Sequence, residues 1–260
     1  QLLRFLDQEI AQALDSQMLQ NGVAIRLGQE HLGIVVNEAG RPTIQLHDGE
    51  TVTADMLLYT MGRIGNTDAL NLPAIGLSTD QQGQLSVNSQ YQTAIPHIYA
   101  TGDVIGFPAL AATAMEQGRL AACHAFQVSE SHDIKVIPYG IYSIPEVSMV
   151  GKTEEELAAA GVPHVTGRAL FREMARGHIS GELHGLLKVV FHRDTHTLLG
   201  VHIIGQGATE LIHIGQSVLT YGGTVEYFVH NVFNYPTMAE CYRTAALDGL
   251  NRLHHHSSQQ

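Results

Sequence analysis

The sequence predicts a mixed α/β segment followed by a separate, compact α+β domain. An amphipathic helix pattern over residues 5–20 leads directly into short β-type runs, and a polar stretch at residues 128–136 interrupts the chain. A second set of strands covered by helices follows that stretch. With 260 residues, 44% hydrophobic and 15% charged, the chain has an ordinary globular composition and enough length for two domains.

Charge and cysteine content exclude several classes of protein. The 14 basic and 25 acidic residues give a net charge of −11, and no run is rich in Lys or Arg, which argues against a nucleic-acid partner. No apolar stretch approaches the roughly 20 residues that span a bilayer, so we expect no membrane segment. Cys123 and Cys241 have no CxxC partner, so we expect a reduced, cytoplasmic protein.

The first part of the chain changes from a helical to a strand period at Asn21-Gly22. Apolar residues recur at every fourth position of the helix over 5–20, and the Asn-Gly pair ends it. A dinucleotide-binding domain ordinarily opens with the strand that carries its nucleotide loop, so we expect an N-terminal part of a longer protein to precede this chain. Strands are expected at residues 23–27, 33–36, 43–46, 56–59, 85–87 and 98–101, and a long helix at residues 109–126.

The second part begins after residues 128–136, which we interpret as an interdomain linker. A capping box of Thr153 and Glu156 predicts a short helix that Gly161 ends. Strands are expected at residues 139–143, 147–150, 185–191 and 197–204, helices at residues 208–220, 225–229 and 237–253, and a polar, disordered tail at residues 254–260.

The most informative window runs from Thr93 to Asp103 and has the pattern T-x-x-P-x-I-Y-A-x-G-D. A short β-branched and aromatic strand ends in Gly-Asp, and a helix begins a few residues later. This order predicts the Asp103 carboxylate at the carboxyl end of a strand, where α/β sheets bind their ligands and where it can accept hydrogen bonds from sugar or ribityl hydroxyls. An isolated Gly-Asp pair is more often a simple turn, but this window is longer.

The window resembles the second flavin-binding motif of the flavoprotein reductases with two dinucleotide-binding domains, the family of dihydrolipoamide dehydrogenase and glutathione reductase. The resemblance implies that Asp103 binds the ribityl chain of FAD. It also implies that Ala109, Leu110 and Ala111 bring a helix N-terminus to the flavin pyrimidine, where free N–H groups and the helix dipole favour negative charge. Taken alone, this second segment would be an ordinary helix start.

Gly62-Arg63 follows the strand expected at residues 56–59. One interpretation is a glycine-containing loop with a solvated arginine. The family resemblance offers another, in which this pair closes the NAD domain and lies near the nicotinamide dinucleotide.

Two other patterns carry no site. Gly205-x-Gly207-x-x-Glu210 lacks the third glycine of a dinucleotide loop and has no acidic ribose partner, so we interpret it as a tight strand-to-helix turn. The 16 histidines include no H-E-x-x-H pair, so we expect no metal site, and residues 254–256 offer only an adventitious one.

The window from Asn234 to Glu240 resembles the C-terminal H-P-T-x-x-E signature of the disulfide reductases in this family, in which the histidine is a general base oriented by the glutamate. Here Tyr235 takes the histidine position. A phenol with an ordinary pKa of about 10 replaces an imidazole near 6.5 poorly in thiol chemistry, which counts against a disulfide substrate. Thr237 and Glu240 also form a capping box for the last helix, and that structural role alone accounts for Glu240.

Longer runs resemble the transhydrogenase branch of the family, whose members pass hydride from NADPH through FAD to NAD+. The runs are at residues 62–68, 140–146, 171–176 and 234–253. The resemblance implies the later part of an NAD(P)-binding domain at residues 1–65, a returning FAD-domain segment at residues 66–130, and an interface domain at residues 131–253 that forms a homo-oligomer. It also implies that the glycine-rich FAD and NAD loops lie before residue 1.

Two alternatives stay open at this point. One is a disulfide or metal-ion reductase of the same family, for which an upstream CxxxxC would be the deciding feature. The other is a non-catalytic dimerisation fragment that folds without flavin.

Overall fold

The computed structural model describes residues 2–129 and 136–257, so most of the linker predicted at residues 128–136 lies outside the described residues. The chain forms two compact units. The carboxyl-terminal unit contains Gln1–Gln29 and Lys135–Gln260, and the central unit contains Glu30–Ile134. None of the helices in the described residues has the length and apolar character needed to cross a membrane.

A five-stranded antiparallel sheet forms the centre of the carboxyl-terminal unit, with the strand order β4-β5-β8-β7-β6. Short connections join β4 to β5 and β7 to β8, as an antiparallel pair allows, whereas β5 and β8, and β6 and β7, are paired across longer segments. The strands are β4 (Tyr139–Ile141), β5 (Val147–Gly151), β6 (His164–Leu170), β7 (Leu186–His192) and β8 (Leu198–Ile204).

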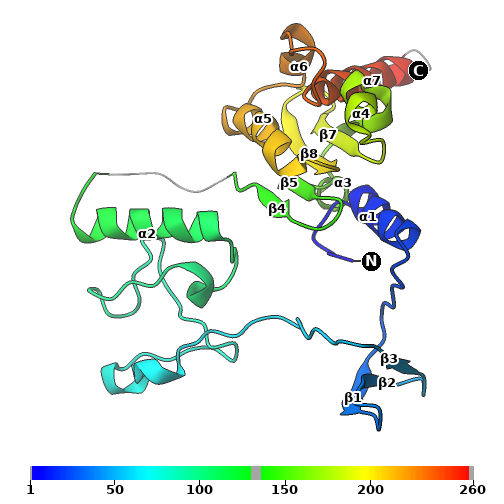
Figure 1. Ribbon diagram of the computed structural model, residues 1–260. Coiled ribbons are helices and arrows are strands. Elements are labelled where there is room, and N and C mark those ends of the chain that lie inside the picture. Colours follow the sequence, from blue (N-terminus) through cyan, green and yellow to red (C-terminus); the bar gives the residue numbers. More distant parts are fainter. Residues whose placement is uncertain (1, 130–135, 258–260) are drawn as a thin grey trace. The chain divides into compact units, whose positions relative to one another are not determined.

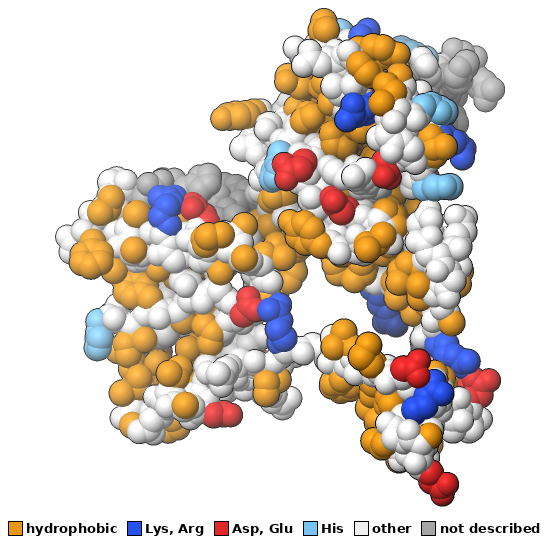
Figure 2. Space-filling view, viewed as in Figure 1, with side chains coloured by type: hydrophobic (Ala, Val, Ile, Leu, Met, Phe, Trp, Pro, Cys, Tyr) orange, Lys and Arg blue, Asp and Glu red, His pale blue; other side chains and the backbone are white. Residues whose placement is uncertain are grey.

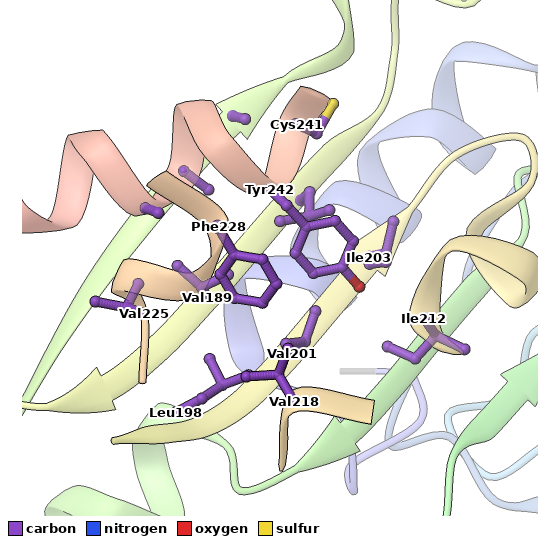
Figure 3. Close-up of a cluster of buried hydrophobic side chains, with 14 of the residues drawn as sticks. Val189, Leu198, Val201, Ile203, Ile212, Val218, Val225, Phe228, Cys241 and Tyr242 are labelled. Carbon is purple, nitrogen blue, oxygen red and sulfur yellow. The ribbon is translucent and has the colours of Figure 1, made fainter. Parts of the chain in front are cut away.

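Helices cover both faces of this sheet (Figure 1). On one face, α1 (Gln8–Gln20) buries Ile10 and Leu14 against strand residues such as Val147. On the other face, α5 (Ala208–Thr220), α6 (Glu226–His230) and α7 (Glu240–Ser257) enclose the larger core shown in Figure 3. Side chains alternate between the two faces along each strand, and helices cover both faces. Both sets of β7 side chains are therefore buried, and the β7 sequence is almost continuously apolar.

The centre of the larger core is an aromatic pair. The rings of Phe228 and Tyr242 stack with their centroids 4.7 Å apart (Figure 3). The Tyr242 hydroxyl donates to the Leu211 carbonyl at 2.8 Å and accepts from the Gly215 N–H at 3.1 Å. Its pKa is raised because the phenol is buried. The two hydrogen bonds join α7 to α5.

Strand β6 was not predicted from the sequence. Its segment His164–Leu170 contains Gly167 where a sequence pattern would want a bulky β-former. The structure gives the reason: a Cβ on Gly167 would lie 1.9 Å from the Ala245 carbonyl oxygen, so only glycine lets α7 approach the strand this closely.

The central unit contains a three-stranded antiparallel sheet and one long helix. The strands are β1 (His31–Val36), β2 (Pro42–Leu46) and β3 (Thr51–Thr53), in that order. The helix α2 (Ala111–Ala125) follows three short 3₁₀ turns, η1 (Asp68–Leu70), η2 (Leu72–Ile75) and η3 (Gly102–Ile105).

Four predicted strands are wrong. Residues 23–27 and 56–59 have no regular structure, and residues 85–87 and 98–101 take part only in the isolated bridges Thr79–Leu85 and Gln92–Tyr99. A strand needs a continuous ladder of backbone hydrogen bonds to a neighbour, and the described residues supply no such ladder for these segments. Around residues 56–64 the apolar side chains stay exposed, namely Met56, Leu57, Leu58, Tyr59, Met61 and Ile64. Figure 2 shows hydrophobic side chains exposed on the visible surface of the molecule.

The remaining helix predictions are confirmed, with shifted ends. Helix α5 has the predicted bounds, and the capping box of Thr153 and Glu156 starts α3 (Glu154–Ala159). In the carboxyl-terminal unit the structure adds η4 (Phe171–Glu173) and α4 (Ala175–Ser180), which were not predicted. In the central unit β3 and the turns η1, η2 and η3 were not predicted either. The last helix extends to Ser257, into the segment predicted as a disordered tail.

Candidate functional site

The Gly-Asp pair of the Thr93–Asp103 window lies in the turn η3, just before α2. Gly102 has φ +77, a conformation that favours glycine, and it is buried. Its N–H donates to the buried Oε1 of Gln117 at 2.8 Å, and the Asp103 carbonyl accepts from the Gly106 N–H at 3.1 Å. The backbone that carries Asp103 is therefore held from both sides.

The Asp103 side chain points out of this turn and is 49% exposed. Its Oδ2 atom lies 2.5 Å from Nη1 of Arg63, whose side chain is 72% exposed. The structure thus brings together two of the predicted site residues, 40 positions apart in the sequence, in one ion pair of the central unit.

The loop that carries Arg63 is held by a close backbone contact. The Gly65 N–H donates to the Gln82 carbonyl at 2.7 Å, and a Cβ on Gly65 would lie 2.1 Å from the Gly83 carbonyl oxygen. The Thr67 hydroxyl donates to the same Gly83 oxygen at 3.0 Å. Gly62 itself has φ +105, and an added Cβ would meet no atom within 4 Å, so its role is conformational.

Helix α2 begins at Ala111, two residues after the start expected from the sequence. Leu110 is the N-cap in an extended conformation, and no side chain caps the first turn. The Thr113 hydroxyl donates to the Leu110 carbonyl at 2.8 Å. Ala111 is exposed, and Ala109 and Leu110 are half-buried. The segment thus presents a short, uncapped helix start.

These features fit a flavin nucleotide. An exposed carboxylate with one oxygen outside the ion pair suits two vicinal hydroxyls, and an uncapped helix N-terminus suits the electron-rich edge of a heterocycle. The central unit offers both on neighbouring segments, residues 102–105 and 108–112.

The window around Tyr235 lies in the carboxyl-terminal unit. Tyr235 is 74% exposed, and it precedes Pro236 in a cis peptide bond. Glu240 Oε2 accepts from the Thr237 N–H at 3.3 Å, whereas the Thr237 hydroxyl donates to the Asn234 carbonyl. The predicted capping box is therefore only half formed. Glu240 stabilises the turn before α7, as its predicted structural role requires.

Other candidate chemical groups do not form a site. Among the described residues, no group of three or more His, Cys, Asp or Glu side chains could hold a metal ion. Cys241 is fully buried, and burial raises the pKa of its thiol to about 12, which disfavours the reactive thiolate.

Sequence reasoning missed Gln117 and a buried ionic cluster. Nothing in the helix pattern marks Gln117, because a polar residue on an amphipathic helix is unremarkable until its burial is known. Lys188 in β7 had a signal: it interrupts the apolar run Leu186–Phe191, where a buried charge requires a partner. That partner is Asp7, beside α1.

Comparison with known proteins agrees with this geometry. Residues 1–118 match the family described as "Pyridine nucleotide-disulphide oxidoreductase", and residues 137–246 match its dimerisation domain. The chain belongs to the pyridine nucleotide-disulphide oxidoreductase family. The match confirms the family resemblance of the sequence and the predicted pairing of an α/β segment with an α+β dimerisation domain.

Relatives within this family extend over nearly the whole chain. The soluble pyridine nucleotide transhydrogenase of Pectobacterium atrosepticum is 54% identical over 256 residues, which are 97% of this chain and 54% of that protein. That of Serratia proteamaculans is 53% identical, over 97% of this chain and 55% of the relative. The chain therefore spans about half the length of the curated relatives it matches.

Solved structures of the family have the same fold. LpdA from Mycobacterium tuberculosis superposes with a TM-score of 0.84 at 27% identity, covering 93% of this chain and 52% of LpdA. The HOCl-induced flavoprotein disulfide reductase RclA from Escherichia coli has a TM-score of 0.89 at 22% identity, covering 95% of this chain and 57% of RclA. The second likeness concerns the fold alone.

Proposed function

We propose that this chain is part of an FAD-dependent pyridine nucleotide transhydrogenase, which transfers hydride from NADPH to NAD+ through the flavin. The observation that carries the proposal is the 54% identity, over 97% of the chain, to a relative named soluble pyridine nucleotide transhydrogenase. In this proposal residues 1–65 belong to the NAD(P)-binding domain, residues 66–130 to the FAD-binding domain and residues 131–253 to the interface domain.

The residues of the central unit would hold the cofactor. Asp103 would accept hydrogen bonds from the ribityl hydroxyls, and the α2 start at Ala109, Leu110 and Ala111 would face the flavin pyrimidine with free N–H groups. Gly62 and Arg63 would lie beside the nicotinamide dinucleotide. When bound, FAD supplies the atom that takes up and returns hydride, and the protein orients it and tunes its charge.

Tyr235 supports a reaction without thiol chemistry. Hydride passes between carbon and nitrogen atoms of the nucleotides and needs no protein base, so an imidazole at this position is unnecessary. The exposed phenol of Tyr235 would serve packing against a second subunit or orientation of a nicotinamide. Glu240, occupied by the turn before α7, would take no part in proton transfer.

The interface domain would form a homodimer, as the description of its family match as a dimerisation domain supports. The acidic composition and two isolated cysteines support a cytoplasmic location.

The test is a paired assay on a joined protein, in which this chain follows the part of the Pectobacterium atrosepticum relative that it does not cover. Purified with FAD, the joined protein should pass hydride from NADPH to an NAD+ analogue whose reduction has a distinct absorbance. It should show no appreciable turnover with a lipoamide-type disulfide. Robust disulfide reduction instead would reject the transhydrogenase and favour the disulfide reductase alternative.

A further inference from the structure

The Asp103 carboxylate is oriented by two parts of the central unit, its own backbone and Arg63. The Asp103 backbone is fixed, because the Gly102 N–H is bound by buried Gln117 and the Asp103 carbonyl accepts from Gly106. The side chain is half exposed, and among the described residues its carboxylate pairs with Arg63 alone. Its orientation therefore depends on Arg63.

Arg63 is in turn held by its own loop. Two residues further on, the Gly65 backbone packs directly on Gly83, and Thr67 donates to the Gly83 carbonyl. Substituting either glycine would push the two segments apart, because each added Cβ would meet backbone atoms within 2.6 Å. The backbone that follows Arg63 is thus anchored, which keeps the Arg63 side chain within reach of Asp103.

The ion pair leaves hydrogen-bond acceptor sites of the Asp103 carboxylate unoccupied. Arg63 Nη1 lies on Oδ2 of the carboxylate, and each carboxylate oxygen has two lone-pair sites. Oδ1 accepts no hydrogen bond in the described residues, so it can take two hydroxyl donors while Oδ2 stays on the guanidinium. An arginine is suited to this task because it remains charged at every physiological pH.

We infer that Arg63 is a positioning residue for the flavin site: it holds Oδ2 of Asp103 and thereby aims Oδ1 at the ribityl hydroxyls of FAD. This inference rests on the proposed flavin-binding role of Asp103. It gives Arg63 a function that acts through Asp103, separate from any contact with the nicotinamide dinucleotide.

The test measures the FAD dissociation constant of the joined protein by titrating its apoprotein with FAD and following flavin fluorescence. Four variants are compared: Arg63→Gln, Arg63→Lys, Asp103→Asn and the double variant Arg63→Gln/Asp103→Asn. Arg63→Gln should weaken FAD binding about two- to fivefold, the range for a solvent-exposed ion pair, and Arg63→Lys should recover part of the loss. Arg119→Gln is the matched control, because Arg119 also forms an exposed ion pair, with Glu116, in the same unit.

The double variant separates positioning from a direct role. If Arg63 acts through Asp103, then Arg63→Gln has no further effect on FAD affinity once Asp103 is Asn. The inference would be overturned if Arg63→Gln lowered FAD affinity equally with Asp103 present and with Asp103→Asn, or if Arg63→Gln alone lowered it not at all. Neither result would contradict the proposed flavin site. An Asp103→Asn variant with undiminished FAD affinity would overturn both the inference and the proposed flavin site. Gel filtration and thermal unfolding of each variant show that its fold is intact.

Discussion

Lys188 Nζ lies 2.8 Å from Oδ2 of Asp7, and both side chains are withdrawn from solvent, with exposures of 1% and 0%. Asp7 is also the N-cap of α1, where its Oδ1 accepts from the Glu9 N–H. Lys188 further contacts Glu9 and Glu154, and its cross-strand neighbour His202 is buried beside it. One cluster of charges thus ties the first helix of the chain to the sheet of the dimerisation domain.

Two opposing effects set the pKa values in this cluster: burial, which disfavours the charged forms, and pairing with opposite charges, which favours them. Burial alone lowers the pKa of Lys188, but hydrogen bonds and charges of Asp7 and Glu154 raise it overall. For Asp7, burial raises the pKa, yet the neighbouring positive charges and the Lys188 hydrogen bond bring it below its ordinary value. Both groups are therefore held in their charged forms, each by its opposite charge.

Lys188→Met should destabilise the carboxyl-terminal unit by about 3–5 kcal/mol, because it leaves the buried Asp7 carboxylate without its counter-charge. The measurement is chemical denaturation of the chain. The double variant Lys188→Met/Asp7→Asn is the control, and it should recover a large part of the loss since no charge is then buried alone. A loss that is the same in the single and the double variant would show that the pair contributes through shape only.

The same cluster predicts how stability depends on pH. Asp7 and Glu9 have folded pKa values lowered from 3.8 and 4.5, so the unfolded chain takes up protons first as the pH falls, and their contribution is lost below about pH 4.5. Lys188 has a pKa raised from 10.5, so its contribution is present below that pH and is lost only above it. Burial lowers the pKa of His202 from 6.5, so the unfolded chain also takes up this proton first, below about pH 6.5. Unfolding free energy should be nearly flat from about pH 7 to 9 and fall in acid. In the double variant Lys188→Met/Asp7→Asn, the unfolding free energy should fall less steeply as the pH decreases.

The isolated 260-residue chain should hold little or no FAD and should not transfer hydride. In the proposed function Asp103 and the start of α2 would supply only one wall of the flavin site, since the chain spans about half the length of its curated relatives. Absorbance after incubation with FAD and gel filtration measures this directly. Stoichiometric flavin in the protein peak would contradict the prediction.

Asp103→Ala should weaken FAD binding to the joined protein by about 1.5–3 kcal/mol, the range for hydrogen bonds to a charged group. The dimerisation domain should stay folded, because Asp103 lies in the other compact unit. Retention of flavin is measured after extensive dialysis, and the oligomeric state by light scattering. A variant that keeps its flavin but loses its oligomeric state would make Asp103 a structural residue.

Tyr235→Phe should leave NADPH-to-NAD+ transfer by the joined protein within about tenfold of the unsubstituted rate, since general acid–base assistance would be worth roughly 10²–10⁴-fold. The exposed ring keeps its packing surface when only the hydroxyl is removed. Initial rates with the nicotinamide acceptor and with a disulfide acceptor are compared for both proteins. A disulfide turnover that the substitution abolishes would make Tyr235 an acid–base residue.

Local sequence determined much of this protein. The T-x-x-P-x-I-Y-A-x-G-D window predicted Asp103 as a site residue, and the period of apolar residues located α1, α5 and the β7–β8 hairpin, because these features depend on residues a few positions apart. The capping box of α3 is equally local. Family membership followed from such motifs without any knowledge of packing.

Tertiary structure alone decided which distant residues meet. Lys188 pairs with Asp7, 181 positions away in the sequence, and Arg63 pairs with Asp103, 40 positions away. Gly167 lets the backbone of α7 pack closely on β6. Strand formation also depends on tertiary structure. Residues 56–59 have the apolar character of a strand but no described neighbouring strand to complete their hydrogen bonds. A periodic pattern encodes how one element folds, whereas its partner depends on the path of the whole chain, since ion pairs, close glycine contacts and sheet edges form only where separate segments are brought together.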